Sequence, residues 1–186
     1  MRIMKNVLAA VAMLLATAVS AVEVGDTIPK DVNVHFGFPP ESINLSSRIA
    51  GKKVILVGLP GAFTPTCSTR QVPGYLAKED ELKELGIDEV IVYSVNDGAV
   101  MTAWSMDQKV PDDSIIKLMG DPYSILTEKL EMELTHAGPK SAGLINRCKR
   151  HALYIVDGTV KIVRVAEKDD DPAGEWRESF SSRWTH

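Results

Sequence analysis

The sequence predicts an α/β domain with a mixed β-sheet, because apolar strands alternate with helical segments and a β-hairpin follows them. Two continuous apolar, β-branched runs, Lys53–Gly58 and Glu89–Val95, have the pattern of strands buried on both faces. Asp157-Gly158 separates two further strand-like runs, 151–156 and 159–163, and this dipeptide is typical of a two-residue hairpin turn. Parallel strands followed by a hairpin require a sheet of mixed direction.

Other runs predict the helices and one shorter strand. From 72 to 85, apolar residues recur among charged ones at the spacing of an amphipathic helix. Asn96-Asp97 offers capping side chains for a second helix that runs past Trp104. Ile116–Met119 is a shorter strand candidate, and Asp121-Pro122, a capping carboxylate followed by proline, predicts a helix start. We therefore expect helices to flank the sheet.

The first 21 residues have the form of a secretory signal peptide. Basic residues open the chain, an apolar run covers residues 7–19, and small residues lead up to Ala21. The run is short for a transmembrane helix, so we expect cleavage and no membrane segment in the mature chain. An uncleaved anchor or a misassigned start codon are the alternatives. Residues 22–186 then suffice for one compact domain with its own core.

Composition excludes some partners without identifying a substrate. The chain is 25% charged and 45% hydrophobic, as is usual for a globular protein, and its formal net charge is −4. No stretch concentrates Lys and Arg, as a nucleic-acid or anionic membrane surface would require. Near the C-terminus, Trp176, Phe180 and Trp184 recur every fourth residue. They predict a helix that packs on the domain or a second subunit, with another partner as the rarer reason.

Cys67 is the candidate nucleophile. It follows a strand that ends at Gly58 and a Pro/Gly-rich loop, and it stands where a helix is expected to begin. Unpaired backbone N–H groups and the positive end of the helix dipole stabilise a thiolate there, which makes a cysteine nucleophilic near neutral pH. Thr64 can reach the sulfur if the loop turns back. Placement alone leaves open that Cys67 is a small buried hydrophobic residue.

The surroundings of Cys67 resemble the active-site motif of the peroxiredoxins. Pro60-x-x-x-Thr64-x-x-Cys67 matches that motif, and the string Pro-Gly-Ala-Phe-Thr-Pro-Thr-Cys-Ser is similar to the type II (peroxiredoxin-5) branch. The resemblance runs from about Val24 to Val163 and includes these further segments: Val24–Pro29, Val72–Tyr75, Ser94–Asp97, Ala103-Trp104 and Arg147–Val156.

This resemblance implies a thioredoxin-like fold, with a mixed central sheet flanked by helices. Thr64-Pro65-Thr66-Cys67 stands where a thioredoxin would have Cys-x-x-Cys, so the second thiol of a dithiol exchanger is missing. The resemblance also implies a thiol-dependent peroxidase that reduces hydrogen peroxide and organic hydroperoxides through a cysteine sulfenic acid. Such an enzyme serves antioxidant defence and cell redox homeostasis, works as a homodimer in the family, and binds no cofactor.

The family's catalytic roles correspond to four residues of this chain. Cys67 matches the peroxidatic nucleophile, Thr64 the residue that orients peroxide and thiolate, and Pro60 the residue that shields the pocket from water. Arg150 matches the arginine that stabilises the thiolate and the charge on the leaving oxygen. A guanidinium suits this task because it stays charged and presents several donors in one plane. Arg147 is the competing arginine, which we expect to be structural.

Cys148 leaves the reducing half of the cycle open. Relatives carry a resolving cysteine at the position of Val92 or near the C-terminus, and this chain has neither. Cys148 lies two residues before Arg150, and residues i and i+2 of a strand share a face. It could therefore resolve Cys67 if their Cα atoms came within about 7 Å. Our default is a one-cysteine cycle, in which glutathione with glutaredoxin, or a thioredoxin-type thiol, reduces the sulfenic acid.

Two other classes of function remain open on these observations. One is a thiol redox sensor or exchange protein without fast turnover, and the other is a structural protein with an inert Cys67. A metal site is not expected, because the four histidines share no ligand spacing with each other or with the cysteines: His35, His136, His151 and His186.

The predicted location conflicts with the predicted reductant. A signal peptide leads to the secretory pathway or an organelle reached through it, where conditions are oxidising, whereas glutathione recycling suits a reducing compartment. If the N-terminal segment is not a functional signal, the cytoplasm or another organelle is the alternative.

Overall fold

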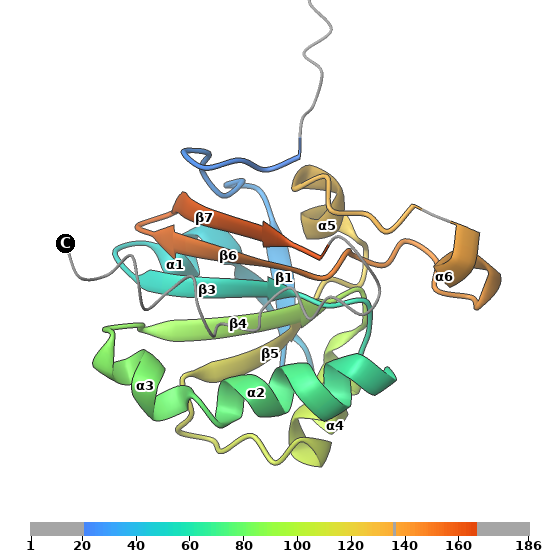
Figure 1. The fold of residues 1–186 in the computed structure, drawn as a ribbon, viewed down its shortest axis with the longest axis horizontal. Coiled ribbons are helices and arrows are strands. Elements are labelled where there is room, and N and C mark those ends of the chain that lie inside the picture. Colours follow the sequence, from blue (N-terminus) through green and yellow to red (C-terminus); the bar gives the residue numbers. More distant parts are fainter. Residues whose placement is uncertain (1–20, 136, 167–186) are drawn as a thin grey trace, which may run out of the picture.

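The structure, a computed structural model, describes residues 21–135 and 137–166. Residues 1–20 of the predicted signal peptide lie outside the described part of the chain, and so does the predicted C-terminal aromatic helix. Within them, a mixed sheet has the order β2-β1-β5-β4-β3-β6-β7 (Figure 1). Its strands are β1 (Asn33–Phe36), β2 (Glu41–Asn44), β3 (Lys53–Gly58), β4 (Glu89–Ser94), β5 (Ile116–Gly120), β6 (His151–Val156) and β7 (Thr159–Val165).

Helices cover both faces of this sheet. They are α1 (Leu45–Ile49), the π-helical turn η1 (Cys67–Gln71), α2 (Val72–Leu76), α3 (Glu79–Glu84), α4 (Gly98–Asp107), α5 (Ile125–Lys129) and α6 (Ala137–Ser141). In Figure 1, helices α2, α3 and α4 lie together in the lower part of the view, whereas α1 and α5 lie in the upper part. No helix in the described part of the chain is long and apolar enough to cross a membrane.

The core divides into two layers, and strand β3 shows why. Val54 and Leu56 belong to the apolar cluster that includes side chains of α1 and α5, whereas Ile55 and Val57 belong to the cluster beneath α2 and α4. Successive side chains of a strand point to opposite faces, so a strand between two helical layers is apolar throughout. The fold class and the two buried strands predicted from the sequence are therefore confirmed.

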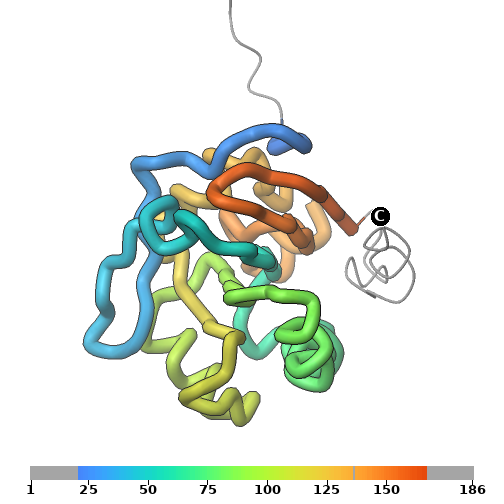
Figure 2. Tube along the Cα trace, turned by 90° about the vertical axis from the view of Figure 1, so that its left-hand side faces the viewer, coloured from blue at the N-terminus to red at the C-terminus, as the bar shows by residue number. Residues whose placement is uncertain are grey.

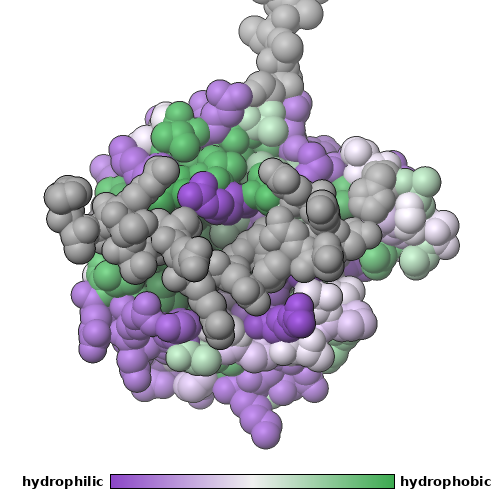
Figure 3. Space-filling model, viewed as in Figure 1, coloured by the Kyte–Doolittle hydropathy of each residue, from purple (hydrophilic) through white to green (hydrophobic). Residues whose placement is uncertain are grey.

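Helix α3 keeps charged side chains on its outer side. In α3, Leu82 is buried while Asp80 and Glu81 are exposed, and Figure 3 shows a hydrophilic surface at the lower left, where Figure 1 places this helix. At the other side of the molecule, the N-terminal segment runs along the β6–β7 hairpin (Figure 2). Gly25 N donates to Val160 O (2.9 Å) and Ile28 N donates to Gly158 O (2.9 Å).

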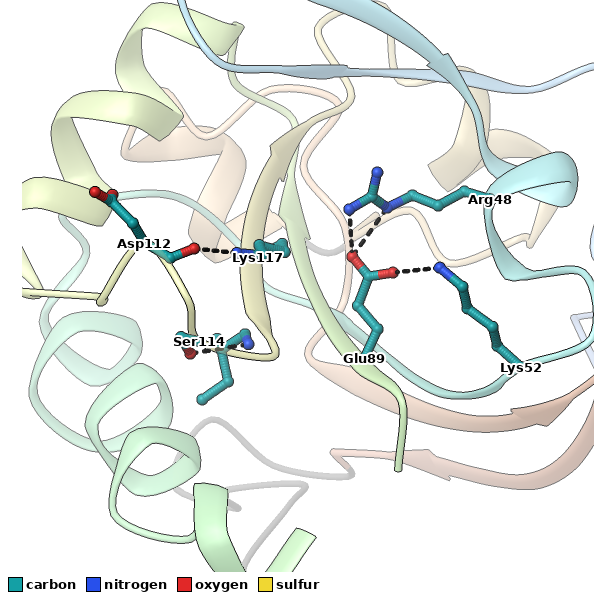
Figure 4. A network of polar contacts seen from close by, with 7 residues as sticks. Arg48, Lys52, Glu89, Asp112, Ser114 and Lys117 are labelled. Carbon is teal, nitrogen blue, oxygen red and sulfur yellow. Dashed lines mark hydrogen bonds and ion pairs between the residues drawn. The ribbon is translucent and has the colours of Figure 1, made fainter. Parts of the chain in front are cut away.

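The amino end of β4 is held by an ion network. Glu89 is only 4% exposed, and its Oε1 accepts from Arg48 Nε (2.9 Å) and Nη2 (2.6 Å) (Figure 4). Lys52 Nζ lies 3.5 Å from the other carboxylate oxygen. Because a buried carboxylate must be paired, this network joins α1 and the following turn to the sheet.

Two helix predictions were wrong in detail. The run 72–85 is not one helix: α2 ends at Leu76 and α3 begins at Glu79, whose carboxylate accepts from Ile115 N (2.9 Å) and Ser114 Oγ (3.0 Å). This anchor on the segment before β5 turns the chain between the two helices.

Asp121-Pro122 does not lie in the first turn of a helix, because α5 begins at Ile125. The Asp121 carboxylate nevertheless accepts from the backbone N–H groups of Leu126 (3.2 Å) and Thr127 (2.9 Å). The sequence analysis therefore predicted the capping role of Asp121 correctly but missed the turn between Asp121 and the start of α5.

The sheet register brings one set of strand ends together. Strands β3, β4 and β5 are parallel, and β6 runs antiparallel to β3 with His151 opposite Gly58. The carboxyl ends of the parallel strands therefore share an edge with the start of β6. The loop that follows Gly58 leads to Cys67 from this edge, which is where sites form in parallel α/β sheets.

Candidate active site

Cys67 lies in the first turn of the helix that follows β3. Helical backbone begins at Pro65, and Ser68 N donates to Thr64 O (3.0 Å), so the sulfur-bearing residue is near the helix start as predicted. Its side chain is fully buried, in the apolar cluster that contains Leu59 and Trp104. A π-helical turn begins at Cys67, and such turns are frequent at functional sites.

The loop before Cys67 turns sharply. Phe63 has φ 59°, a left-handed conformation that is uncommon for a residue with a side chain, and the residue is 53% exposed. The turn brings the Thr64 hydroxyl to the carbonyl of Gly61, to which it donates at 2.9 Å. The hydroxyl hydrogen is thereby used, which leaves the lone pairs of Thr64 Oγ1 as acceptors.

Helix α4 holds the other side of this helix start. Trp104 is fully buried, and its indole Nε1 donates to Ser68 Oγ (3.0 Å). The Trp104 and Phe63 rings have their centroids 6.4 Å apart. The residue after Cys67 and the loop before it are thus both fixed against α4.

Asn96 and Arg147 hold the first part of the loop. Arg147 Nη1 donates to Pro60 O (3.3 Å) and to Asn96 Oδ1 (3.0 Å), and Asn96 Oδ1 also accepts from Ala62 N (3.1 Å). The sequence predicted Asn96 as a possible helix cap, but Asp97 caps α4 by accepting from Val100 N (2.9 Å). Arg147, expected to be structural, contacts the loop that carries the candidate nucleophile.

Arg150 directly precedes β6. Its carbonyl accepts from Ala166 N (2.9 Å), and the register places it beside the point where β3 passes into the Cys67 loop. Its guanidinium Nη1 is buried without a hydrogen-bond partner among the described residues. A buried, charged donor left unpaired is costly, so this nitrogen is suited to an anionic sulfur or a peroxide oxygen.

Cys148 lies two residues before Arg150, in the segment that leads into β6. Its Sγ donates to the carbonyl of Leu59 (2.9 Å), and neither Cys148 nor Cys67 is in a disulfide. Burial raises the pKa of the Cys148 thiol far above its ordinary value, and the negative charges of Asp121 and Cys67 raise it further. Cys148 therefore stays protonated near neutral pH and bonds to the first residue of the Cys67 loop.

A buried polar cluster, which the sequence did not reveal, lies next to Cys148. His151 is fully buried, and burial lowers its pKa to about 4. Its Nδ1 lies 2.8 Å from Lys149 O and its Nε2 lies 3.3 Å from Tyr93 Oη. Because a carbonyl only accepts, Nδ1 carries the proton and Nε2 accepts from the Tyr93 hydroxyl. Burial also raises the pKa of Tyr93 well above its ordinary value, so the phenol remains protonated.

Within the described residues, no three His, Cys, Asp or Glu side chains come together in a way that could hold a metal ion. The chemistry-bearing groups at the sheet edge are instead the thiols of Cys67 and Cys148, the Thr64 hydroxyl, the Arg147 and Arg150 guanidinium groups, and the His151–Tyr93 pair.

Comparison with known proteins identifies the family to which this arrangement belongs. The Redoxin family model matches residues 23–175. Peroxiredoxin-2B of Arabidopsis thaliana is 41% identical over 147 residues, which cover 77% of this chain and 87% of that protein. The chain belongs to the peroxiredoxin family. The type II branch and the thioredoxin-like fold predicted from the motif around Cys67 are confirmed.

Two further relatives define the extent of the similarity. The chloroplastic Peroxiredoxin-2E of Arabidopsis thaliana is 40% identical over 152 residues, which cover 80% of this chain and 63% of that longer protein. The crystal structure of reduced Prx3 from Vibrio vulnificus in complex with H2O2 has a TM-score of 0.71 and 33% identity, over 80% of this chain and 87% of that one. Peroxiredoxins are thiol-dependent peroxidases that need no bound cofactor and use an external thiol, so this peroxiredoxin has thiol-dependent peroxidase activity.

Proposed function

We propose that Cys67 is the peroxidatic cysteine of this peroxiredoxin and that it works in a one-cysteine cycle. The observation that carries the proposal is the position of Cys67 at a helix start, behind the Thr64 turn and at the edge where Arg150 presents an unpaired buried donor. Burial of Cys67 excludes water from the reaction.

The oxidative half-reaction follows from these groups. The Cys67 thiolate attacks the terminal oxygen of the hydroperoxide, a sulfur–oxygen bond forms, and the oxygen–oxygen bond breaks. The leaving hydroxide or alkoxide takes a proton and departs as water or alcohol, and the sulfenic acid remains on Cys67. Sulfur is oxidised by two electrons and the peroxide is reduced by two. Negative charge moves onto the leaving oxygen, where a preorganised donor lowers the barrier most.

Three other residues have complementary roles in this proposal. The free lone pairs of Thr64 Oγ1 accept the peroxide O–H and so orient the substrate. The Arg150 guanidinium donates to the sulfur and to the oxygen that develops charge. Pro60, held through its carbonyl by Arg147, covers the pocket.

An external thiol then restores Cys67. It attacks the sulfenic sulfur and releases water, and a second thiol resolves the mixed disulfide, as glutathione with glutaredoxin or a thioredoxin-type donor would do. Cys148 is a poor resolving residue, because its thiol is buried, protonated and bonded to Leu59 O. Attack on oxidised sulfur requires a thiolate.

Mass spectrometry after one equivalent of hydrogen peroxide tests this cycle. We expect one added oxygen on Cys67, trapped by dimedone, in the wild type and in Cys148→Ser, and no trapped product in Cys67→Ser. A Cys67–Cys148 disulfide in the wild type would overturn the one-cysteine cycle. Peroxide loss that stops at one equivalent despite excess thiol would instead indicate a redox sensor.

We also propose that residues 1–21 are a cleaved signal peptide, that residues 22–186 form the mature domain, and that the domain dimerises. Sequence form supports the first two statements and family membership the third. Two relatives are named chloroplastic, which is consistent with an organelle location. Sequencing of the mature N-terminus and sedimentation equilibrium of the mature chain test these statements; an uncleaved Met1 or a monomer at micromolar concentration would contradict them.

A further inference from the structure

We propose that Asn96 and Arg147 form a clamp that positions Thr64 for peroxide binding, by fixing the backbone of residues 60–62. The proposal rests on the roles proposed above for Cys67 and Thr64. It assigns positioning roles to two residues outside the Pro60–Cys67 motif.

Arg147 supplies the donor side of the clamp. Its Nη1 lies between two oxygens, Pro60 O at 3.3 Å and Asn96 Oδ1 at 3.0 Å. Arg147 is half-buried, and its carbonyl accepts from Leu134 N (2.7 Å), so its backbone is fixed as well. A charged donor bonds more strongly than a neutral one, which makes this a firm attachment of the loop to the segment before β6.

Asn96 supplies the acceptor side. Its Oδ1 accepts from Ala62 N (3.1 Å), Ser94 Oγ (2.9 Å) and Arg147 Nη1 (3.0 Å). Ala62 N and Arg147 Nη1 can only donate, so the amide must present its oxygen and not its nitrogen to the loop. The orientation of Asn96 is thereby determined, and the loop is tied to the end of β4.

Gly61 transmits the clamp to Thr64. A Cβ on Gly61 would lie 2.5 Å from Arg147 Nη1 and 3.3 Å from Thr64 Cγ2, so the guanidinium and the threonine methyl both pack on this glycine. The Gly61 carbonyl accepts the Thr64 hydroxyl at 2.9 Å. A shift of residues 60–62 therefore moves or reorients the group that is proposed to accept the peroxide O–H.

This arrangement predicts a selective defect when the clamp is broken. Reaction with peroxide depends on Thr64, and a misplacement of about 1 Å can cost about 100-fold in rate. Alkylation of Cys67 by iodoacetamide needs the thiolate but not the threonine. Breaking the clamp should therefore slow the oxidation of Cys67 by peroxide much more than its alkylation by iodoacetamide.

Asn96→Leu removes the acceptor without changing charge. We expect oxidation of Cys67 by hydrogen peroxide to slow about 10- to 100-fold, with alkylation by iodoacetamide changed less than about threefold. In a Thr64→Val background the same substitution should have almost no further effect on the peroxide rate, because the clamp acts through Thr64. The matched control is Asn44→Leu: Asn44 Oδ1 also accepts from three donors, at 2.9–3.0 Å, but caps α1.

The outcomes separate the two proposals. Equal slowing of both reactions, additivity with Thr64→Val, or the same defect in Asn44→Leu would overturn the clamp. Wild-type protein in which peroxide leaves Cys67 unmodified would instead refute the site itself. If Asn96→Leu does not fold, Arg147→Lys provides the test, because a lysine keeps the charge but not the planar fork. It should give a smaller loss of peroxide rate with alkylation unchanged, and an unaltered peroxide rate would count against the clamp.

Discussion

The imidazole of His151 occupies the space that a side chain on Gly58 would need. A Cβ on Gly58 would lie 2.0 Å from His151 Cε1, and the two residues are direct partners across β3 and β6. Gly58 ends the strand that leads to Cys67, so the absence of its side chain lets the buried cluster of His151 and Tyr93 sit against the start of the loop.

Gly58→Ala should therefore destabilise the domain. Overpacking a rigid site costs about 1–3 kcal/mol, and the ring cannot retreat without breaking its bonds to Lys149 O and Tyr93 Oη. Urea denaturation measures this loss. Gly74→Ala is the control, because Gly74 lies in α2 and a Cβ there would have nothing within 4 Å, so alanine should stabilise by about 0.5–1 kcal/mol. Equal stability of Gly58→Ala and the wild type would contradict the packing.

His151 predicts a loss of stability in acid. Its pKa is about 4 in the folded protein, against an ordinary 6.5. Between these two pH values, His151 is protonated in the unfolded chain but neutral in the folded protein. The contribution of His151 to the free energy of unfolding is therefore fully present above pH 6.5. It falls as the pH drops toward 4, by up to about 1.4 kcal/mol for each pH unit.

Denaturation of the wild type and His151→Phe across this pH range provides the comparison. The variant keeps a ring of similar size and loses the titration, so it should be less stable at neutral pH but should show a shallower decline in acid. Parallel pH profiles for the two proteins would be the contrary result.

The ion network of Glu89, at the edge of the sheet away from Cys67, should contribute to the stability of the domain. Glu89→Gln leaves Arg48 and Lys52 without their shared carboxylate, and hydrogen bonds to charged groups contribute about 1.5–3 kcal/mol each to stability. We expect a loss of that order in chemical denaturation, with peroxidase activity retained. Glu81→Gln is the control, since Glu81 pairs with Lys78 on the exposed side of α3 and such pairs contribute less than about 1 kcal/mol.

The sequence predicted the parts of this protein whose signal is local. Lys53–Gly58 and His151–Val156 were predicted with the bounds that the structure has, because a strand buried on both faces is apolar throughout. Strands β1 and β2 were missed, because they are short, and Glu41–Asn44 reads Glu-Ser-Ile-Asn with two exposed residues. An edge strand of that kind has neither an apolar run nor a clear alternation.

The same distinction holds at the site. Cys67 and Thr64 are three residues apart, so a predicted helix start and a short motif were enough to propose both as site residues. The contacts of Asn96 with Ala62 and Arg147 span 34 and 51 residues, and no local pattern indicates them. The position of Asn96 after β4 was a usable signal of a site residue, because the carboxyl ends of parallel strands lie at one edge of a sheet. Only the order of the strands in the sheet shows which strand ends are neighbours.

Arg150 gives the most direct functional prediction. Replacing it with methionine should slow the oxidation of Cys67 by hydrogen peroxide about 100- to 1000-fold, the range found when one transition-state donor is removed. Arg150→Lys should recover part of the rate, because charge returns without the planar set of donors. Stopped-flow measurement under single-turnover conditions provides the rates. Arg164→Met is the control, since Arg164 is exposed on β7 and bonds to the neighbouring Val163 O (3.1 Å). If Arg150→Met oxidised at the wild-type rate, its buried unpaired Nη1 would need another explanation, and Arg147 would become the arginine to test against the reacting oxygen.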